Sequence, residues 1–136
     1  MNKDEVIDLI KDAGFGFLAT TEGKQPRVRP MMPYLTEEGD FLLALLSHSR
    51  TIPQIKENPL VEICYVDRKM CFCRISGKAV LRTNPEKKEA VWDNVPMLRQ
   101  YFASPQDPKF VLLEIETTSI EAMSPTQKTP DTLSLK

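Results

Sequence analysis

The fold is decided by residues 15–46, FGFLATTEGKQPRVRPMMPYLTEEGDFLLALL. They hold three runs rich in apolar and β-prone residues, at 15–21, 27–36 and 41–46. Glycine-containing turns separate the runs, and this pattern predicts consecutive antiparallel strands. Pro30 and Pro33 lie inside the second run. Since proline donates no ladder hydrogen bond, we expect this strand at an edge or opening of the sheet, with backbone groups left for a ligand.

The rest of the chain predicts further strands and short helices. An amphipathic helix at 3–13 has Asn2 or Asp4 as its cap and ends at Gly14. Gly77 interrupts a long strand and marks a bulge or a close approach of backbone. The other expected elements are helices at 50–58 and 85–92, a turn or two at 95–102, and strands at 61–66, 71–82, 109–116 and 118–123. The chain is therefore predicted to be mainly β, a closed or split barrel of about six antiparallel strands with short peripheral helices.

Length and charge narrow the classes of protein. The 136 residues fit one domain, which we expect at 1–124. A tail at 125–136, rich in Pro, Thr and Ser, is expected to be loose or packed on a partner. The net charge of −1 argues against nucleic acid as a partner. No run is long and apolar enough for a membrane, and the N-terminus lacks signal-peptide features, so the expected location is the cytoplasm.

The three cysteines, Cys64, Cys71 and Cys73, are expected to be free thiols. Their C-x6-C-x-C spacing does not match the CxxC-like pairs of structural zinc sites, and the chain has one histidine. Buried or half-buried thiols are the better interpretation, and no metal site is predicted.

Two clusters are suited to an anion. Arg27 and Arg29 alternate on one strand, so both project to the same face, where two guanidinium groups suit a phosphate or carboxylate. Pro30 and Met31 follow them directly. The alternative is a solvated face of an edge strand.

The second cluster is Ser47-His48-Ser49-Arg50-Thr51, between a strand and a helix. Hydroxyls, backbone N–H groups and Arg50 favour an anion there, and helix capping by Ser49 is the compatible alternative. His48, the one histidine, is a candidate acid, base or haem ligand, or simply exposed. Three aromatic side chains could stack on a planar ring or only pack: Trp92, Tyr65 and Tyr101.

Five motifs occur in an order that resembles the pyridoxamine 5′-phosphate oxidase-like family, the FMN-binding split barrels. They are Arg29-Pro30-Met31-Met32-Pro33-Tyr34, Phe41-Leu42-Leu43-Ala44-Leu45-Leu46, Ser49-Arg50-Thr51, Gln54-Ile55-Lys56-Glu57-Asn58-Pro59 and Arg74-Ile75-Ser76-Gly77-Lys78-Ala79. The resemblance implies a six-stranded antiparallel split barrel, a homodimer, and FMN at the subunit interface. It also implies the cofactor-binding residues: Arg27, Arg29, Pro30, Met31, Met32, Ser47, His48, Ser49, Arg50 and Thr51.

The chain departs from the biosynthetic oxidases of that family. Thr51 stands in place of the lysine of Ser-Arg-Lys, Tyr34 replaces a second lysine, and Phe72 a glutamine. The C-terminal Arg-x-His segment is absent. The chain therefore looks more like the short branch of general-stress and nitroimidazole-resistance-type proteins. This implies a flavin-dependent oxidoreductase acting on a small acceptor. The alternatives are a non-catalytic flavin-binding stress protein and a haem-binding split barrel.

Overall fold

The strand β4 (Phe41–Leu46) is covered on both faces in the computed structural model, which describes residues 1–136. Leu43 and Leu45 of this strand face the larger core, whereas Leu42 lies in a second cluster with Val91 of α3 (Pro85–Asn94). A strand that is covered on both faces needs an unbroken apolar run, and residues 41–46 provide one.

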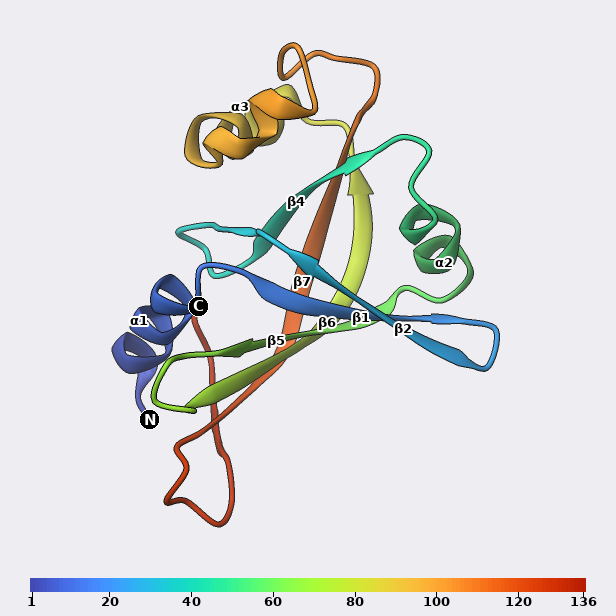
Figure 1. Ribbon diagram of the computed structural model, residues 1–136. Coiled ribbons are helices and arrows are strands. Elements are labelled where there is room, and N and C mark those ends of the chain that lie inside the picture. The colour runs from blue at the N-terminus through green and yellow to red at the C-terminus, as the bar shows by residue number, and fades with distance from the viewer.

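The strands form one antiparallel sheet that curls into a split barrel (Figure 1). Its order is β2-β1-β5-β6-β7-β4-β3, and β8 pairs with β7. The two edge strands follow each other along the chain, separated by Met32 and Pro33, and the sheet stays open between them. The remaining strands are β1 (Gly16–Glu22), β2 (Gln25–Met31), β3 (Tyr34–Leu35), β5 (Leu60–Val66), β6 (Phe72–Arg82), β7 (Phe110–Met123) and β8 (Asp131–Leu133).

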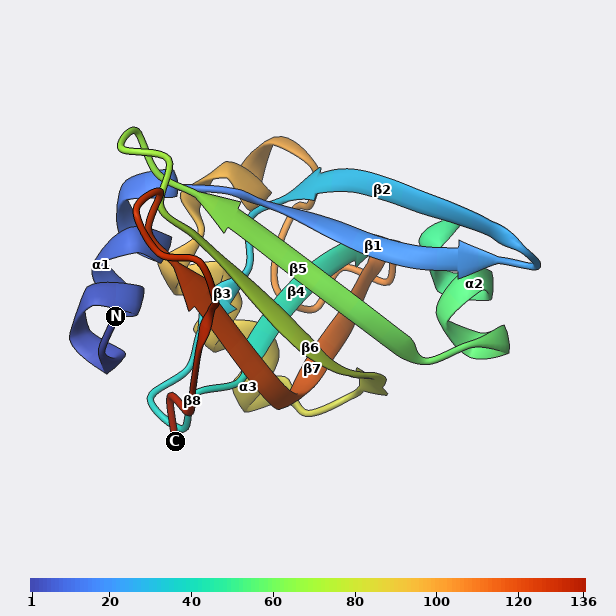
Figure 2. The same cartoon turned by 90° about the horizontal axis from the view of Figure 1, so that it is seen from below.

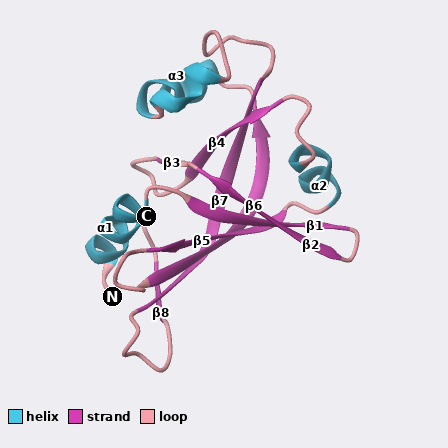
Figure 3. Ribbon diagram, in the orientation of Figure 1, coloured by secondary structure: helices cyan, strands magenta, loops and turns pink.

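The helices lie at the periphery of the sheet (Figure 3). α1 (Lys3–Ala13) begins at a capping box, in which Asn2 and Glu5 accept each other's backbone N–H, and ends at Gly14 with φ 79°. α2 (Thr51–Glu57) packs on β1, and α3 packs on β4 and on the 3₁₀ helix η1 (Pro96–Gln100). None of these helices is long and apolar enough to cross a membrane.

The prediction of a mainly β split barrel is confirmed, but the count of six strands is wrong. The structure has eight, because two short strands escape the sequence pattern. β3 has two residues, since Pro33 breaks the expected strand at 27–36 into β2 and β3. β8 comes from the tail. The expected pieces at 109–116 and 118–123 are one continuous strand, β7.

The tail, expected to be loose or packed on a partner, is docked in part on the chain's own sheet. Residues 131–133 pair with Ile120–Ala122 of β7, and the side chain of Leu135 is 3% exposed. The amino group of Met1 forms an ion pair with Asp131. On the other side, the backbone of Leu135 approaches Gly39, where a Cβ would lie 2.8 Å from its carbonyl oxygen. Two apolar side chains in a polar tail are thus enough to dock it: Leu133 and Leu135.

Gly77→Ala is expected to lower the free energy of unfolding by about 1–3 kcal/mol, the usual cost of overpacking a core. The β6–β7 register shifts between Ser76 and Gly77, and a Cβ at Gly77 would lie 2.6 Å from the carbonyl oxygen of Glu116. Urea unfolding measures the loss, with Ser76→Ala as the neighbouring control. Equal stability of the two variants would show that the strands can separate at no cost.

Candidate functional site

β2 brings two arginines to the interior side of the barrel's open edge. In the register, Arg27 lies opposite Thr20 and Arg29 opposite Leu18, and both partners on β1 are buried. Arg27 and Arg29 therefore share one face of β2, as their spacing predicts. Burial, and then the charge of Arg27, lower the pKa of Arg29 from its ordinary value. The two guanidinium groups are thus close enough to repel each other.

Hydrogen bonds hold both arginines in place. Arg27 donates from Nη2 and Nε to Glu22 Oε1, at 2.9 and 3.1 Å. Arg29 donates from Nη2 to Gln54 Oε1 at 2.7 Å and from Nη1 to the Leu18 carbonyl oxygen at 3.2 Å. Gln54 comes from α2, so this helix helps to orient the edge strand. The arginines are half-buried or exposed, and they can still meet a ligand.

The segment before α2 supplies a third arginine but few amide donors. Ser49 Oγ accepts the backbone N–H of Thr51, its carbonyl oxygen accepts that of Ile52, and Pro53 has no N–H. Ser49 thus bonds the first backbone amide of α2, but the N-cap residue is Arg50, which makes no side-chain cap hydrogen bond. An anion here must be met by side chains such as the exposed Arg50, whose charge also contributes to lowering the pKa of Glu22.

An apolar cavity of about 490 Å³ includes the chain neighbours of two of these cations, Pro30 after Arg29 and Ser49 before Arg50, although none of the three arginines lines it. Ligand pockets commonly have volumes of about 300–1,000 Å³. The cavity lies between Phe15, the end of β2, β4, and η1 with the residues on either side of it. Its lining residues are Phe15, Pro30, Met31, Met32, Leu43, Ala44, Leu45, Leu46, Ser49, Val95, Met97, Leu98, Tyr101 and Phe102.

Four predicted cofactor-binding residues line this cavity: Pro30, Met31, Met32 and Ser49. Ser47 and His48 are exposed and lie outside the lining, and Thr51 is 6% exposed, with its side chain turned into the core. Of the three aromatic candidates, Tyr101 lines the cavity. Tyr65 is buried in the barrel core, and Trp92 lies under the guanidinium group of Arg99.

Apart from Tyr101, sequence reasoning missed the part of the cavity built by 95–102. Val95, Met97, Leu98 and Phe102 come from a segment far along the chain from β2, and their place depends on α3 packing against β4. The sequence did hold a usable signal, because a short polar helix is followed by several apolar and aromatic residues. In the structure two of them, Met97 and Tyr101, are exposed, and exposed apolar patches often mark a binding site.

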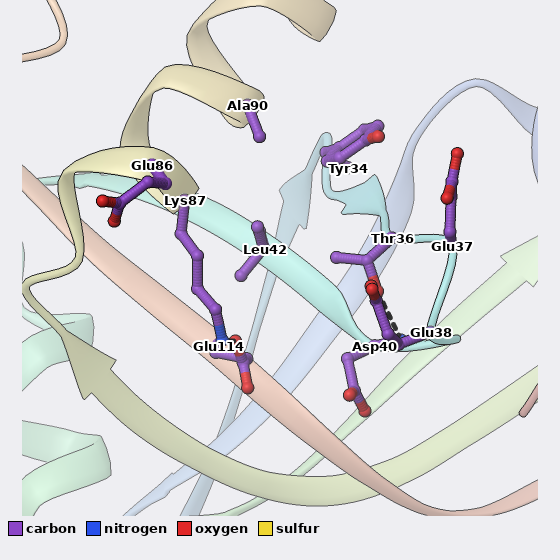
Figure 4. A pocket seen from close by; sticks show the side chains of 10 residues that line it. All are labelled: Tyr34, Thr36, Glu37, Glu38, Asp40, Leu42, Glu86, Lys87, Ala90 and Glu114. Carbon is purple, nitrogen blue, oxygen red and sulfur yellow. Dashed lines mark hydrogen bonds and ion pairs between the residues drawn. The ribbon is translucent and has the colours of Figure 1, made fainter.

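A second cavity, of about 510 Å³, has the opposite character (Figure 4). Lys87 is its one basic lining residue and forms an ion pair with the buried Glu114. The other four carboxylates that line it are those of Glu37, Glu38, Asp40 and Glu86. This negative lining disfavours a phosphate, so the apolar cavity beside the arginines is the candidate site for a phosphate-bearing ligand.

Comparisons with known proteins identify the family of this chain. Residues 1–128 match the model of the pyridoxamine 5′-phosphate oxidase-like family, which is nearly the whole chain. The chain belongs to this family. It is 29% identical over 143 residues to general stress protein 26 of Bacillus subtilis, with 98% of this chain and 96% of that protein covered. The predicted resemblance to this family, and to its general-stress branch, is confirmed.

Solved structures show the same fold. A NimC/NimA family protein from Clostridium acetobutylicum has a TM-score of 0.83 and 28% identity, over 97% of this chain and 91% of that chain. A haem-binding protein from Mycobacterium smegmatis has a TM-score of 0.80 at 14% identity, over 98% of this chain and 57% of that chain. At 14% identity the likeness shows the fold alone.

Proposed function

We propose that this protein binds FMN, with the ring system in the apolar cavity and the phosphate on the arginines of β2 and Arg50. The observation that carries the proposal is continuity between the two surfaces. Along β2, Arg29 directly precedes the cavity residues Pro30 and Met31. On the other side, Ser49 lines the cavity and is bonded to Arg50 in the chain. A ligand with a planar apolar body and one anionic end fits such a site.

The residues present suit the two parts of FMN. The guanidinium groups of the arginines can donate paired hydrogen bonds to phosphate oxygens, and the apolar cavity wall can pack against the flat faces of a ring. β2 is an edge strand, so one side of its backbone has no strand partner and can meet the polar edge of the ring. Thr51 would contribute through the shape of the segment, because its side chain is 6% exposed.

A homodimer would complete the site. Four large apolar side chains at the cavity are exposed by 42–54%: Phe15 47%, Met32 42%, Met97 43% and Tyr101 54%. Apolar rims of this kind are commonly buried in an interface. We therefore propose that a second copy of the chain covers the open side. Light scattering at micromolar concentration is expected to report a dimer, and a monomer there would contradict the shared site.

The reaction class follows from the lining. Bound FMN would supply the capacity to carry electrons between a donor and an acceptor. The chain's own residues bind and orient the cofactor and exclude water. Tyr101 is the one titratable side chain in the cavity lining. We propose an oxidoreductase that acts on a small acceptor. The scarcity of acid–base groups favours the second candidate, a flavin-binding stress protein without turnover.

The test is an absorbance spectrum of the purified protein and a titration with FMN followed by fluorescence quenching. Saturable binding is expected, with riboflavin binding more weakly because it lacks the phosphate. No binding of FMN, or a haem absorbance band in its place, would refute the proposal.

Turnover separates the two flavin functions. FMN-loaded protein that is reduced by a nicotinamide donor and reoxidised by a small acceptor is an oxidoreductase; tight binding with no turnover supports the stress protein. We expect His48→Ala to retain any turnover, because His48 is exposed and outside the cavity lining. A large loss in this variant would assign His48 to the reaction.

A further inference from the structure

A carboxylate lies among the cations of the proposed phosphate site. Glu22, at the end of β1, accepts both hydrogen bonds from Arg27 through Oε1. Its other oxygen, Oε2, accepts from Gln54 Nε2 at 3.2 Å. The bonds from Arg27 and Gln54, and the charges of Arg27 and Arg50, lower the pKa of Glu22, so this side chain is ionised at neutral pH. Figure 2 shows β1 and β2 side by side, with α2 beside the end of β1 that carries Glu22.

Gln54 links this carboxylate to Arg29. Its side chain is buried, at 5% exposure. Oε1 accepts from Thr20 Oγ1 at 2.6 Å and from Arg29 Nη2 at 2.7 Å. Because Nε2 donates to Glu22 while Oε1 has two donors, the amide has one orientation that satisfies all of its partners. Arg27, Glu22, Gln54 and Arg29 thus form one continuous network, and the two arginines are held by it without a ligand.

The summed charge of this network and the nearby Arg50 is matched to one phosphate group. The guanidinium groups of Arg27, Arg29 and Arg50 with the carboxylate of Glu22 leave a net charge of about +2. A phosphate monoester carries a charge of about −1.5 to −2 at neutral pH. Glu22 occupies two donor atoms of Arg27, Nε and Nη2, and its charge opposes any anion that binds beside the arginines.

We propose that Glu22 is a resident counter-ion of this site, which weakens phosphate binding and sets how much negative charge the site accepts. The inference deepens the proposed function and rests on it for the identity of the ligand. When a phosphate binds, Arg27 shares or transfers its hydrogen bonds from the carboxylate to the phosphate oxygens. Gln54 keeps Arg29 in place throughout, because its contacts do not involve the phosphate.

The test compares Glu22→Gln with the wild-type protein. The change removes the charge and keeps the shape and one oxygen that can accept from Arg27, while the oxygen that accepts from Gln54 Nε2 is replaced by a donor. The affinity for FMN is expected to rise about threefold to tenfold at low salt, and the gain should shrink as salt rises, while riboflavin affinity stays the same. The matched control is Glu121→Gln, since Glu121 accepts from Arg74 Nη2 at 2.7 Å in an ion pair of similar exposure on β6 and β7.

A second readout needs no flavin. Inorganic phosphate, compared with chloride at equal ionic strength, should raise the melting temperature of Glu22→Gln more than that of the wild type or of Glu121→Gln. If phosphate raises the melting temperature of Glu22→Gln more and the wild type binds no FMN, the counter-ion role of Glu22 is supported and the flavin proposal fails. If Glu22→Gln binds FMN no better than the wild type and gains nothing from phosphate, the counter-ion inference is overturned. Weaker phosphate binding in Glu22→Gln overturns it as well, because Glu22 would then serve only to position Arg27.

Discussion

Arg29→Ala is expected to lower the affinity for FMN about 10- to 150-fold and to leave riboflavin affinity nearly unchanged. Hydrogen bonds to charged groups contribute about 1.5–3 kcal/mol, and each 1.4 kcal/mol is a factor of ten in affinity. Arg29 is the partly buried arginine of β2, with its guanidinium held by Gln54 and Leu18. A donor that is already oriented loses less rotamer freedom when the ligand binds. Fluorescence titration with both flavins measures the effect.

The controls separate loss of a phosphate contact from loss of structure. Arg74→Ala makes the same change at an exposed arginine of β6, which is ion-paired with Glu121 of β7, and should leave FMN affinity unchanged. Arg29→Lys keeps the positive charge but not the paired N–H donors of the guanidinium group, so an intermediate loss of FMN affinity is expected. Melting temperatures check that the network around Gln54 survives. Equal losses for FMN and riboflavin would mean that Arg29 shapes the cavity, and no loss for either would place the phosphate elsewhere.

Local chemistry was enough to predict most of the fold. Pro30 and Pro33 predict an edge strand, and β2 lies at the edge of the sheet, opposite the edge strand β3. Gly77 predicts a bulge, and the β6–β7 register shifts there. These features follow from one residue's backbone, so a sequence reveals them. The break between β2 and β3 and the pairing of β8 depend instead on distant strands, which no local pattern reports.

The residues of the candidate site also divide into those that the local sequence predicts and those that depend on contacts between distant parts of the chain. The arginines on β2 were predictable because strand alternation fixes their face. Glu22 and Gln54 were not identified, although both lie within reach of the arginines in the folded chain. Glu22 approaches Arg27 across the β1–β2 hairpin, where Glu22 pairs with Gln25, and a hairpin register could have suggested it. Gln54 required the packing of α2 on β1, a tertiary contact. The polar partners that orient a site are therefore harder to predict than the charged groups that attract its ligand.

Leu135→Ala is expected to lower the free energy of unfolding by about 2–5 kcal/mol, the range for truncating a buried leucine. The tail composition favours a loose segment, yet Leu135 is 3% exposed in the main core and its backbone closes on Gly39. Removing the side chain leaves a void in the main core beside the β3–β4 turn, and we expect it to loosen the nearby β8 pairing. Urea unfolding of the wild type and the variant measures the difference.

Thr132→Ala, in β8 and exposed, is the control, and it should change stability by less than about 0.5 kcal/mol, as surface substitutions usually do. The pair of variants decides between a docked and a loose tail, because a loose tail would make both changes equally mild. A docked tail also fixes the first turn of α1 through the ion pair of Asp131 with Met1. Loss of Leu135 is then expected to speed hydrogen exchange in α1 as well as in β8, whereas faster exchange in β8 alone would show that the two termini are not coupled.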